Sequence, residues 1–71
     1  MPETPILFDD VEVLEKSGLG YTVRIGHQHV FVGSAVPLAG TTATVIGQVG
    51  RLVLPRWFVE QERIAGGLVL Q

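Results

Sequence analysis

The chain has 71 residues, so we expect one domain with a thin core, because folding at this size buries only roughly 60% of the surface of the unfolded chain. Zero cysteines exclude disulfides, two histidines give little material for a metal site, and 46% apolar against 17% charged residues exceeds what a small monomer needs to bury. We therefore expect a homodimer or larger oligomer, and the net charge of −2 argues against a general nucleic-acid binder.

The N-terminal part of the chain is predicted to be a loose end followed by a strand. Residues 1–5 contain two prolines and few apolar side chains, so we place a single domain over residues 6–71. Residues 6–14 are predicted as a strand, because Val11 and Val13 alternate with polar neighbours. Two adjacent aspartates interrupt the longer pattern.

Charge is unevenly distributed along the sequence. Five of the seven acidic residues occur in the first fifteen positions, whereas residues 16–71 contain five basic residues against two acidic ones, a balance of +3. The acidic segment also contains Ile6, Leu7 and Phe8. It is predicted either to dock into a basic groove of a partner protein or to form an edge strand with a charged solvent face.

A β-hairpin is predicted in the middle of the chain. Two β-rich runs, residues 21–25 and 29–32, flank a turn at residues 26–28. Residues 33–40, which contain Pro37 and two glycines, are predicted as a connecting loop.

A second hairpin is predicted after this loop. Residues 41–46 are dense in β-branched side chains, residues 47–50 read as a turn, and residues 51–54 continue as a strand. Pro55 is then expected to open a helix of ten residues, because proline fits the first helical position. Glycines at 66–67 are expected to end it.

The helix is predicted to turn three apolar side chains toward the core, namely Trp57, Phe58 and Ile64. Residues 68–70 form one last short apolar strand with no obvious partner within the chain, which is a second reason to expect an oligomer. The predicted fold class is mostly β with one short helix, in a small β-barrel.

The element Gly50-Arg51-Leu52-Val53-Leu54-Pro55, followed by a helix and by Gly67 before a final strand, carries a family resemblance. Residues 42–71 resemble the AbrB, MazE and SpoVT group of swapped-hairpin DNA-binding domains. The resemblance implies two chains that exchange hairpins to close one barrel, and a DNA-binding transcriptional regulator or antitoxin-type module. An SH3-like barrel is the alternative fold.

The DNA-binding interpretation assigns its contacts with duplex DNA to four basic residues, Arg51, Arg56, Arg24 and Lys16. Arg51 matches the arginine that follows the glycine in the family. Other positions that are basic in the family hold Thr44, Val45, Val59 and Glu60 here. The rival interpretation is a protein-interaction or assembly module without DNA binding. Basic residues that converge on one face would favour DNA, and scattered ones would favour a protein partner.

No pattern in the sequence indicates an enzyme, a metal site or a cofactor. His27 and His29 could share one face of a strand but have no third ligand nearby. Asp9 and Asp10 are adjacent and would point to opposite sides of a strand, so they make a poor acid and base pair. We read these side chains as solvated turn residues.

No stretch resembles a signal peptide, and none is long enough to span a membrane. The absence of cysteine fits a reducing compartment. We therefore expect a cytoplasmic protein.

Overall fold

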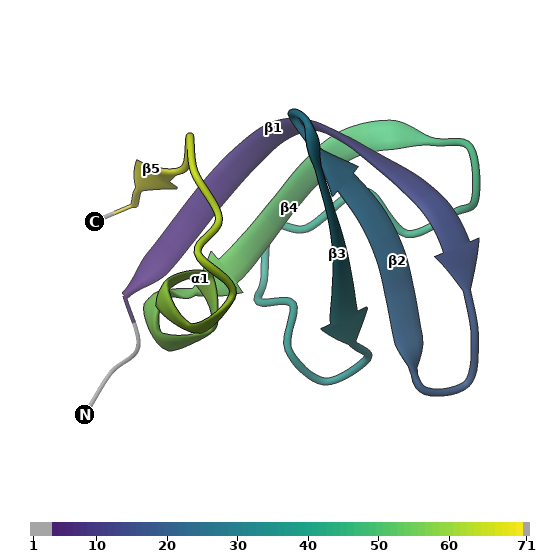
Figure 1. Ribbon diagram of the computed structural model, residues 1–71, viewed down its shortest axis with the longest axis horizontal. Coiled ribbons are helices and arrows are strands. Elements are labelled where there is room, and N and C mark those ends of the chain that lie inside the picture. Colours follow the sequence, from purple (N-terminus) through teal and green to yellow (C-terminus); the bar gives the residue numbers. More distant parts are fainter. Residues whose placement is uncertain (1–3, 71) are drawn as a thin grey trace.

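The protein is mostly β, with one short helix beside a small antiparallel sheet (Figure 1). A computed structural model describes residues 4–70. The elements are β1 (Pro5–Lys16), β2 (Gly20–Ile25), β3 (Gln28–Gly33), β4 (Val49–Pro55), α1 (Arg56–Glu62) and β5 (Leu68–Val69). The strand order is β3-β2-β1-β4, and β5 pairs with β1. The predicted class, mostly β with one short helix, is confirmed.

β1 is the long central strand of the sheet, and it bends in the middle. Its first half pairs with β4 and β5, and its second half pairs with β2 and the start of β4. A register shift between Phe8 and Val11 marks the bend, where Asp10 has a φ of 56°. Aspartate tolerates this left-handed conformation, so the two aspartates that interrupt the sequence pattern form a β-bulge. β1 is therefore a central strand and not the edge strand that the acidic segment was predicted to form.

The core lies under the inward face of the four main strands. Val11 and Val13 are fully buried, as their alternation predicts. Val13, Val23 and Val30 are cross-strand neighbours and line up on the inner face of β1, β2 and β3. β1 begins at Pro5, which the sequence assigned to the loose end, and residues 1–3 of that end lie outside the described part of the chain.

β2 and β3 form the predicted hairpin. Their register pairs Ile25 with Gln28 and leaves Gly26 and His27 as a two-residue turn. Gly26 has a φ of 61°, as a type II′ turn requires at its first position. The turn fixes the register of both strands and therefore decides which side chains face inward.

Residues 41–46 do not form a strand, so the predicted second hairpin is wrong. The segment does run beside β4, but threonine side chains make much of the contact. The Thr41 hydroxyl accepts the Val53 N–H at 3.0 Å, and the Thr42 hydroxyl accepts the Arg51 N–H at 2.9 Å. Because these hydroxyls occupy donors that a partner strand's carbonyls would otherwise bind, a regular ladder does not form.

α1 is shorter than predicted. Pro55 is the last residue of β4 and lies in extended backbone (φ −69°, ψ 147°), so the helix begins at Arg56 and not at the proline. It ends after seven residues, because Arg63 adopts a left-handed conformation with φ 54° and ψ 49°. The predicted stop at the paired glycines is therefore wrong by several residues. The early stop returns the chain toward the core, where Ile64 is buried.

The inward face of α1 is only partly as predicted. Phe58 and Ile64 are buried, but the side chain of Trp57 is 50% exposed, so the prediction that it faces the core is wrong. Adjacent residues on a helix are about 100° apart, and Phe58 already occupies the inward position. The Trp57 ring instead packs edge-on against the Phe58 ring, with centroids 5.8 Å apart.

The last strand finds a partner within its own chain, contrary to prediction. β5 pairs with the first half of β1, with Val69 opposite Ile6 and Leu68 opposite Leu7. Gly67 precedes it at a close approach, since a Cβ there would overlap the Ile6 side chain and lie 2.8 Å from the Phe8 ring. A glycine is therefore needed where the chain crosses β1.

A side-chain amide ties the segment after α1 to the tip of the β2–β3 hairpin. Gln28 Nε2 donates to the Arg63 carbonyl and Gln28 Oε1 accepts the Ala65 N–H, both at 3.1 Å. Two bonds from one side chain hold the end of the helix in place. Within residues 4–70, no helix has the length and apolar character needed to cross a membrane.

Candidate interaction surface

The four basic residues predicted to bind DNA lie on four different elements. Pro5 pairs with Pro55, so Arg56 lies at the start of β1, whereas Lys16 ends that strand of 12 residues. These two positive charges are therefore near opposite ends of a molecule whose longest extent is 31 Å. The structure does not bring the four together into one basic face.

Two of the four are neutralised by carboxylates. Arg24 on β2 pairs with Glu12 on β1, with Nη2 and Oε1 2.5 Å apart, and Arg56 Nε lies 3.1 Å from Glu60 Oε1 within α1. Both pairs are partly exposed, so they weaken the local positive potential and add little stability.

The other two basic residues have different surroundings. The Lys16 ammonium lies 5.6 Å from the centre of the Tyr21 ring, at the distance of a cation–π contact. Arg51 on β4 is exposed and has no carboxylate partner among residues 4–70. Of the four, Arg51 is thus the one whose charge is most available to a ligand.

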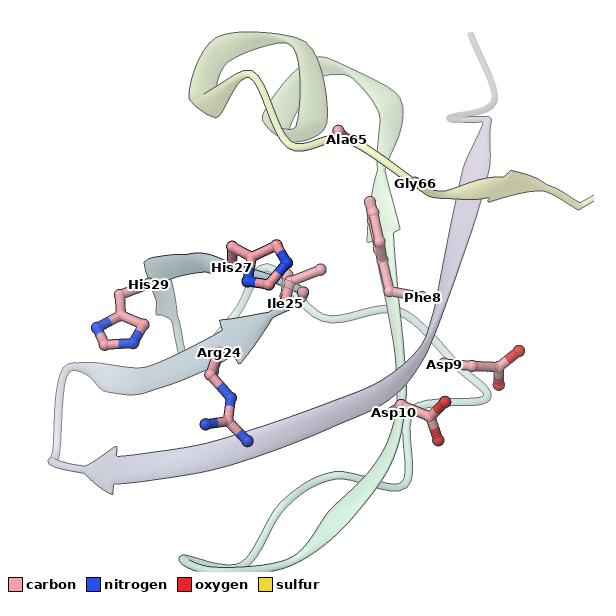
Figure 2. Close-up of a pocket in the computed structure, with 10 residues that line it drawn as sticks. Phe8, Asp9, Asp10, Arg24, Ile25, His27, His29, Ala65 and Gly66 are labelled. Atoms are coloured by element: carbon pink, nitrogen blue, oxygen red, sulfur yellow. The ribbon is translucent and has the colours of Figure 1, made fainter.

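An open cleft of about 680 Å³ lies between the hairpin tip, the bend of β1 and the segment after α1 (Figure 2). His27, His29 and Arg24 come from the hairpin, and Phe8 points from β1 toward Gly66. The carboxylates of the two aspartates at the bend point away from the histidines. No group of three potential metal ligands exists among residues 4–70.

Large apolar side chains, by contrast, are exposed on several elements. Nine of them are exposed in the described part of the chain, and they fall into three groups by their position in the fold. The groups are Trp57 with Leu68, Val69 and Leu70; Val45 with Ile46 and Val49; and Leu19 with Phe31. Single exposed apolar residues are ordinary, but grouped ones mark binding surfaces.

The first group, Trp57, Leu68, Val69 and Leu70, is called the apolar end. The Arg56 N–H donates to the Thr4 carbonyl and the Leu70 N–H donates to the Pro5 carbonyl, both at 2.9 Å. The first residue of α1 and the residue after β5 therefore bond Thr4 and Pro5, where β1 begins. Leu68 and Val69 are 61% and 57% exposed.

In the second group, Val45 and Ile46 lie on a turn that is hydrogen-bonded to β1, and Val49 begins β4. The Gly47 N–H donates to the Val13 carbonyl at 2.8 Å, and the Val13 N–H donates to the Gln48 carbonyl at 3.2 Å. This anchoring presents Val45 and Ile46 to solvent at the tip.

Sequence reasoning located only residues 68–70 of these surfaces, as an apolar strand without an obvious partner in the chain. The apolar composition indicated that some apolar surface should face a partner, but Trp57 was assigned to the core. One signal was present in the sequence: Val45 and Ile46 are bulky β-branched residues directly before Gly47, a position where a turn exposes them.

Comparison with protein-family models, with curated proteins and with solved structures finds no match to this chain. The AbrB-like resemblance of residues 42–71 therefore stays a prediction. The exposed apolar and basic side chains are therefore the features of this chain that bear on its function.

Proposed function

We propose that this protein is a protein-interaction module that binds a partner through the apolar end. The observation that carries the proposal is that α1 and β5 flank the start of β1 and together expose four large apolar side chains, one of them a half-exposed tryptophan. Tryptophan is enriched among the residues that contribute most binding energy at protein interfaces.

The apolar end is held rigid before any partner arrives. β5 is paired to β1, the Trp57 ring rests against Phe58, and hydrogen bonds fix both flanks of the surface. A preorganised surface loses less conformational entropy on binding than a flexible one. Burying exposed apolar area contributes roughly 25 cal/mol per Å² before that cost is subtracted.

Charges near the apolar end suit the rim of an interface. The Arg56–Glu60 pair lies on α1 beside Trp57, and both of its side chains are 65% exposed. A polar, solvated rim around an apolar centre is the usual composition of a protein interface. The exposed Asp9 and Asp10 at the bend of β1 are further polar contacts for a partner, whereas Ile6 and Phe8 are buried and cannot serve as a docking peptide.

The proposal is tested by capturing partners from a cell extract with the intact protein and measuring the affinity of each recovered protein by calorimetry. Trp57→Ala should weaken binding about tenfold or more while the fold persists. Arg51→Ala is the matched control and should bind as the parent does. Loss of binding in Arg51→Ala but not in Trp57→Ala would contradict the proposal.

Phe58→Ala separates binding from stability. This ring is buried, so its removal should cost about 3 to 5 kcal/mol of unfolding free energy. Trp57→Ala should cost much less, because half of that side chain is already exposed. Thermal unfolding of both variants checks that reduced binding by Trp57→Ala is a surface effect.

DNA binding by a homodimer, as an AbrB-like regulator or antitoxin-type module, is the second candidate. Exposed Arg51 in its Gly-Arg context favours it, while the pairing and dispersal of the other basic residues favour a protein partner. Fluorescence anisotropy on mixed-sequence duplexes at low salt tests it. Binding that falls with salt and weakens in Arg51→Ala would support the DNA candidate, and no binding would eliminate it.

A further inference from the structure

β3 is the outer strand of the sheet, and only one of its edges is paired (Figure 1). Strands joined by a two-residue turn exchange hydrogen bonds at the pair flanking the turn and at every second pair beyond it. Here those pairs are Ile25 with Gln28, Val23 with Val30, and Tyr21 with Val32. The remaining residues of β3, namely His29, Phe31 and Gly33, direct their N–H and C=O groups away from β2.

Most of the outward backbone groups on this edge of β3 have no hydrogen-bond partner among residues 4–70. Within residues 4–70, nothing bonds the outward N–H and C=O groups of His29 and Phe31, and only the Gly33 carbonyl is used, by the Val36 N–H at 3.0 Å. Proteins usually protect such an edge with proline, lysine or a bulge. β3 contains neither residue, and its pairing with β2 is regular.

We propose that β3 pairs antiparallel with β3 of a second copy of this chain, across a two-fold axis at Phe31. The register that uses all of these outward-facing residues places Phe31 opposite Phe31 of the partner subunit, and His29 opposite Gly33 of the partner subunit. The contact is self-complementary, as a two-fold dimer requires. It joins two sheets into one and uses a different surface from the apolar end.

The side chains of the edge favour a second copy as the occupant. Phe31 is 51% exposed on the outer face, so the two rings would face each other across the axis. The cross-strand row behind Phe31 runs through Thr22 to Glu15, so its nearest charge is two strands from the edge. In the other row His29 meets an uncharged glycine. Self-pairing therefore brings no like charges together.

Cysteine cross-linking tests the register directly, because the chain has no cysteine of its own. Cα atoms in a hydrogen-bonded antiparallel pair are about 5.5 Å apart, within the range of a disulfide. Under mild oxidation at micromolar concentration, Phe31→Cys should become almost entirely covalent dimer. Thr22→Cys is the matched control, since two copies of that position would be about 14 Å apart across three strand spacings. Equal cross-linking of both variants, or none in Phe31→Cys, would overturn the proposal.

Oppositely charged substitutions at Phe31 test whether the strand that pairs with β3 belongs to a second copy of this chain. The intact protein should elute in light-scattering chromatography at twice its 7.7 kDa chain mass at high micromolar concentration. Phe31→Lys and Phe31→Glu should each dimerise about tenfold more weakly, because like charges then face each other, and mixing the two should restore the dimer. A monomeric parent, or a mixture no more dimeric than its components, would refute β3 pairing. Trp57→Ala should leave the dimer unchanged. A result against β3 pairing can therefore be told apart from a result against partner binding at the apolar end.

Discussion

The main path of the sheet, β3-β2-β1-β4, ends in two outer strands, β4 and β3, whose outer edges have different surroundings. Beside β4, residues 38–43 cover the strand, and Thr41 and Thr42 supply hydroxyls to its amides. Beside β3, nothing in residues 4–70 bonds the outward groups of His29 and Phe31, and only the Gly33 carbonyl is bonded, by the Val36 N–H. Both strands are rich in apolar residues, so composition alone does not distinguish them.

The difference shows that an edge can be closed without another strand. The Leu38 N–H donates to the Val53 carbonyl at 2.8 Å, and the Thr42 and Ala43 N–H groups share the Arg51 carbonyl. Backbone donors thus serve the carbonyls of β4 while threonine hydroxyls serve its amides. We infer that the backbone groups of the β4 edge are used within the fold, whereas those of the β3 edge are available to bind another chain.

The largest expected effect is a difference in stability between substitutions on β4 and on β3, because the two strands differ in burial. Leu52 on β4 is 2% exposed, so Leu52→Ala should lower the free energy of unfolding by about 2 to 5 kcal/mol. Phe31→Ala on β3 should change monomer stability by about 0.5 kcal/mol or less, since that ring is half exposed. Urea unfolding at low protein concentration measures both. Similar losses of unfolding free energy from the two variants would mean that the Phe31 ring is more buried than its exposed fraction indicates.

A smaller effect should come from the hydroxyl that covers the middle of β4. Thr41→Val keeps the shape of the side chain but leaves the Val53 N–H without its acceptor at 3.0 Å, which should cost about 1 to 3 kcal/mol. Thr22→Val on β2 is the control and should be nearly neutral, because no hydrogen bond of the Thr22 hydroxyl exists within residues 4–70. Faster hydrogen exchange at the Val53 amide in Thr41→Val would locate the change. An unaltered exchange rate would argue against the hydroxyl cover.

The neighbouring hydroxyl should contribute less. Thr42 is exposed, so the Arg51 N–H that it accepts at 2.9 Å can bond water once the hydroxyl is lost. We expect Thr42→Val to cost about 0.5 to 1.5 kcal/mol in thermal unfolding, below the loss in Thr41→Val. The reverse order would show that solvent reaches the Val53 amide more easily than the Arg51 amide.

The smallest effect concerns the ion pair that lies between the two edges. Arg24 and Glu12 face each other on β2 and β1, with side chains 51% and 28% exposed. Glu12→Gln should therefore cost only about 0.2 to 1 kcal/mol, and the difference from the parent should shrink as salt rises. Unfolding curves at low and high ionic strength check this. A loss that salt does not reduce would indicate a packing role for Glu12.

Parts of the fold that depend on local pattern could be predicted from the sequence. The β2–β3 hairpin follows from two β-rich runs around Gly26, and the burial of Val11 and Val13 follows from their alternation. The sequence also shows the interruption at the two aspartates, but it predicts solvated turn residues there, whereas the structure has a β-bulge within β1. In each case the cause lies within a few residues of its effect.

What could not be predicted depends on partners distant in the sequence. Residues 41–46 have the composition of a strand, but their threonine hydroxyls bond β4, and β4 pairs with β1 and not with them. Trp57 and Phe58 are both apolar, and only the packing of α1 on the sheet decides which is buried. The location of the apolar end follows from the pairing of β5 with β1, which no local pattern encodes.

That pairing also bears on how the chain is made. β1 precedes β4 and β5 in the chain, so it is synthesised before both of the strands that flank its first half. Until they emerge, the first half of β1 has open edges on both sides and Ile6 and Phe8 lack most of their cover. Sheet completion must therefore wait for the C-terminal third of the chain, and a nascent chain stalled before Val49 would present an apolar, unpaired strand to chaperones.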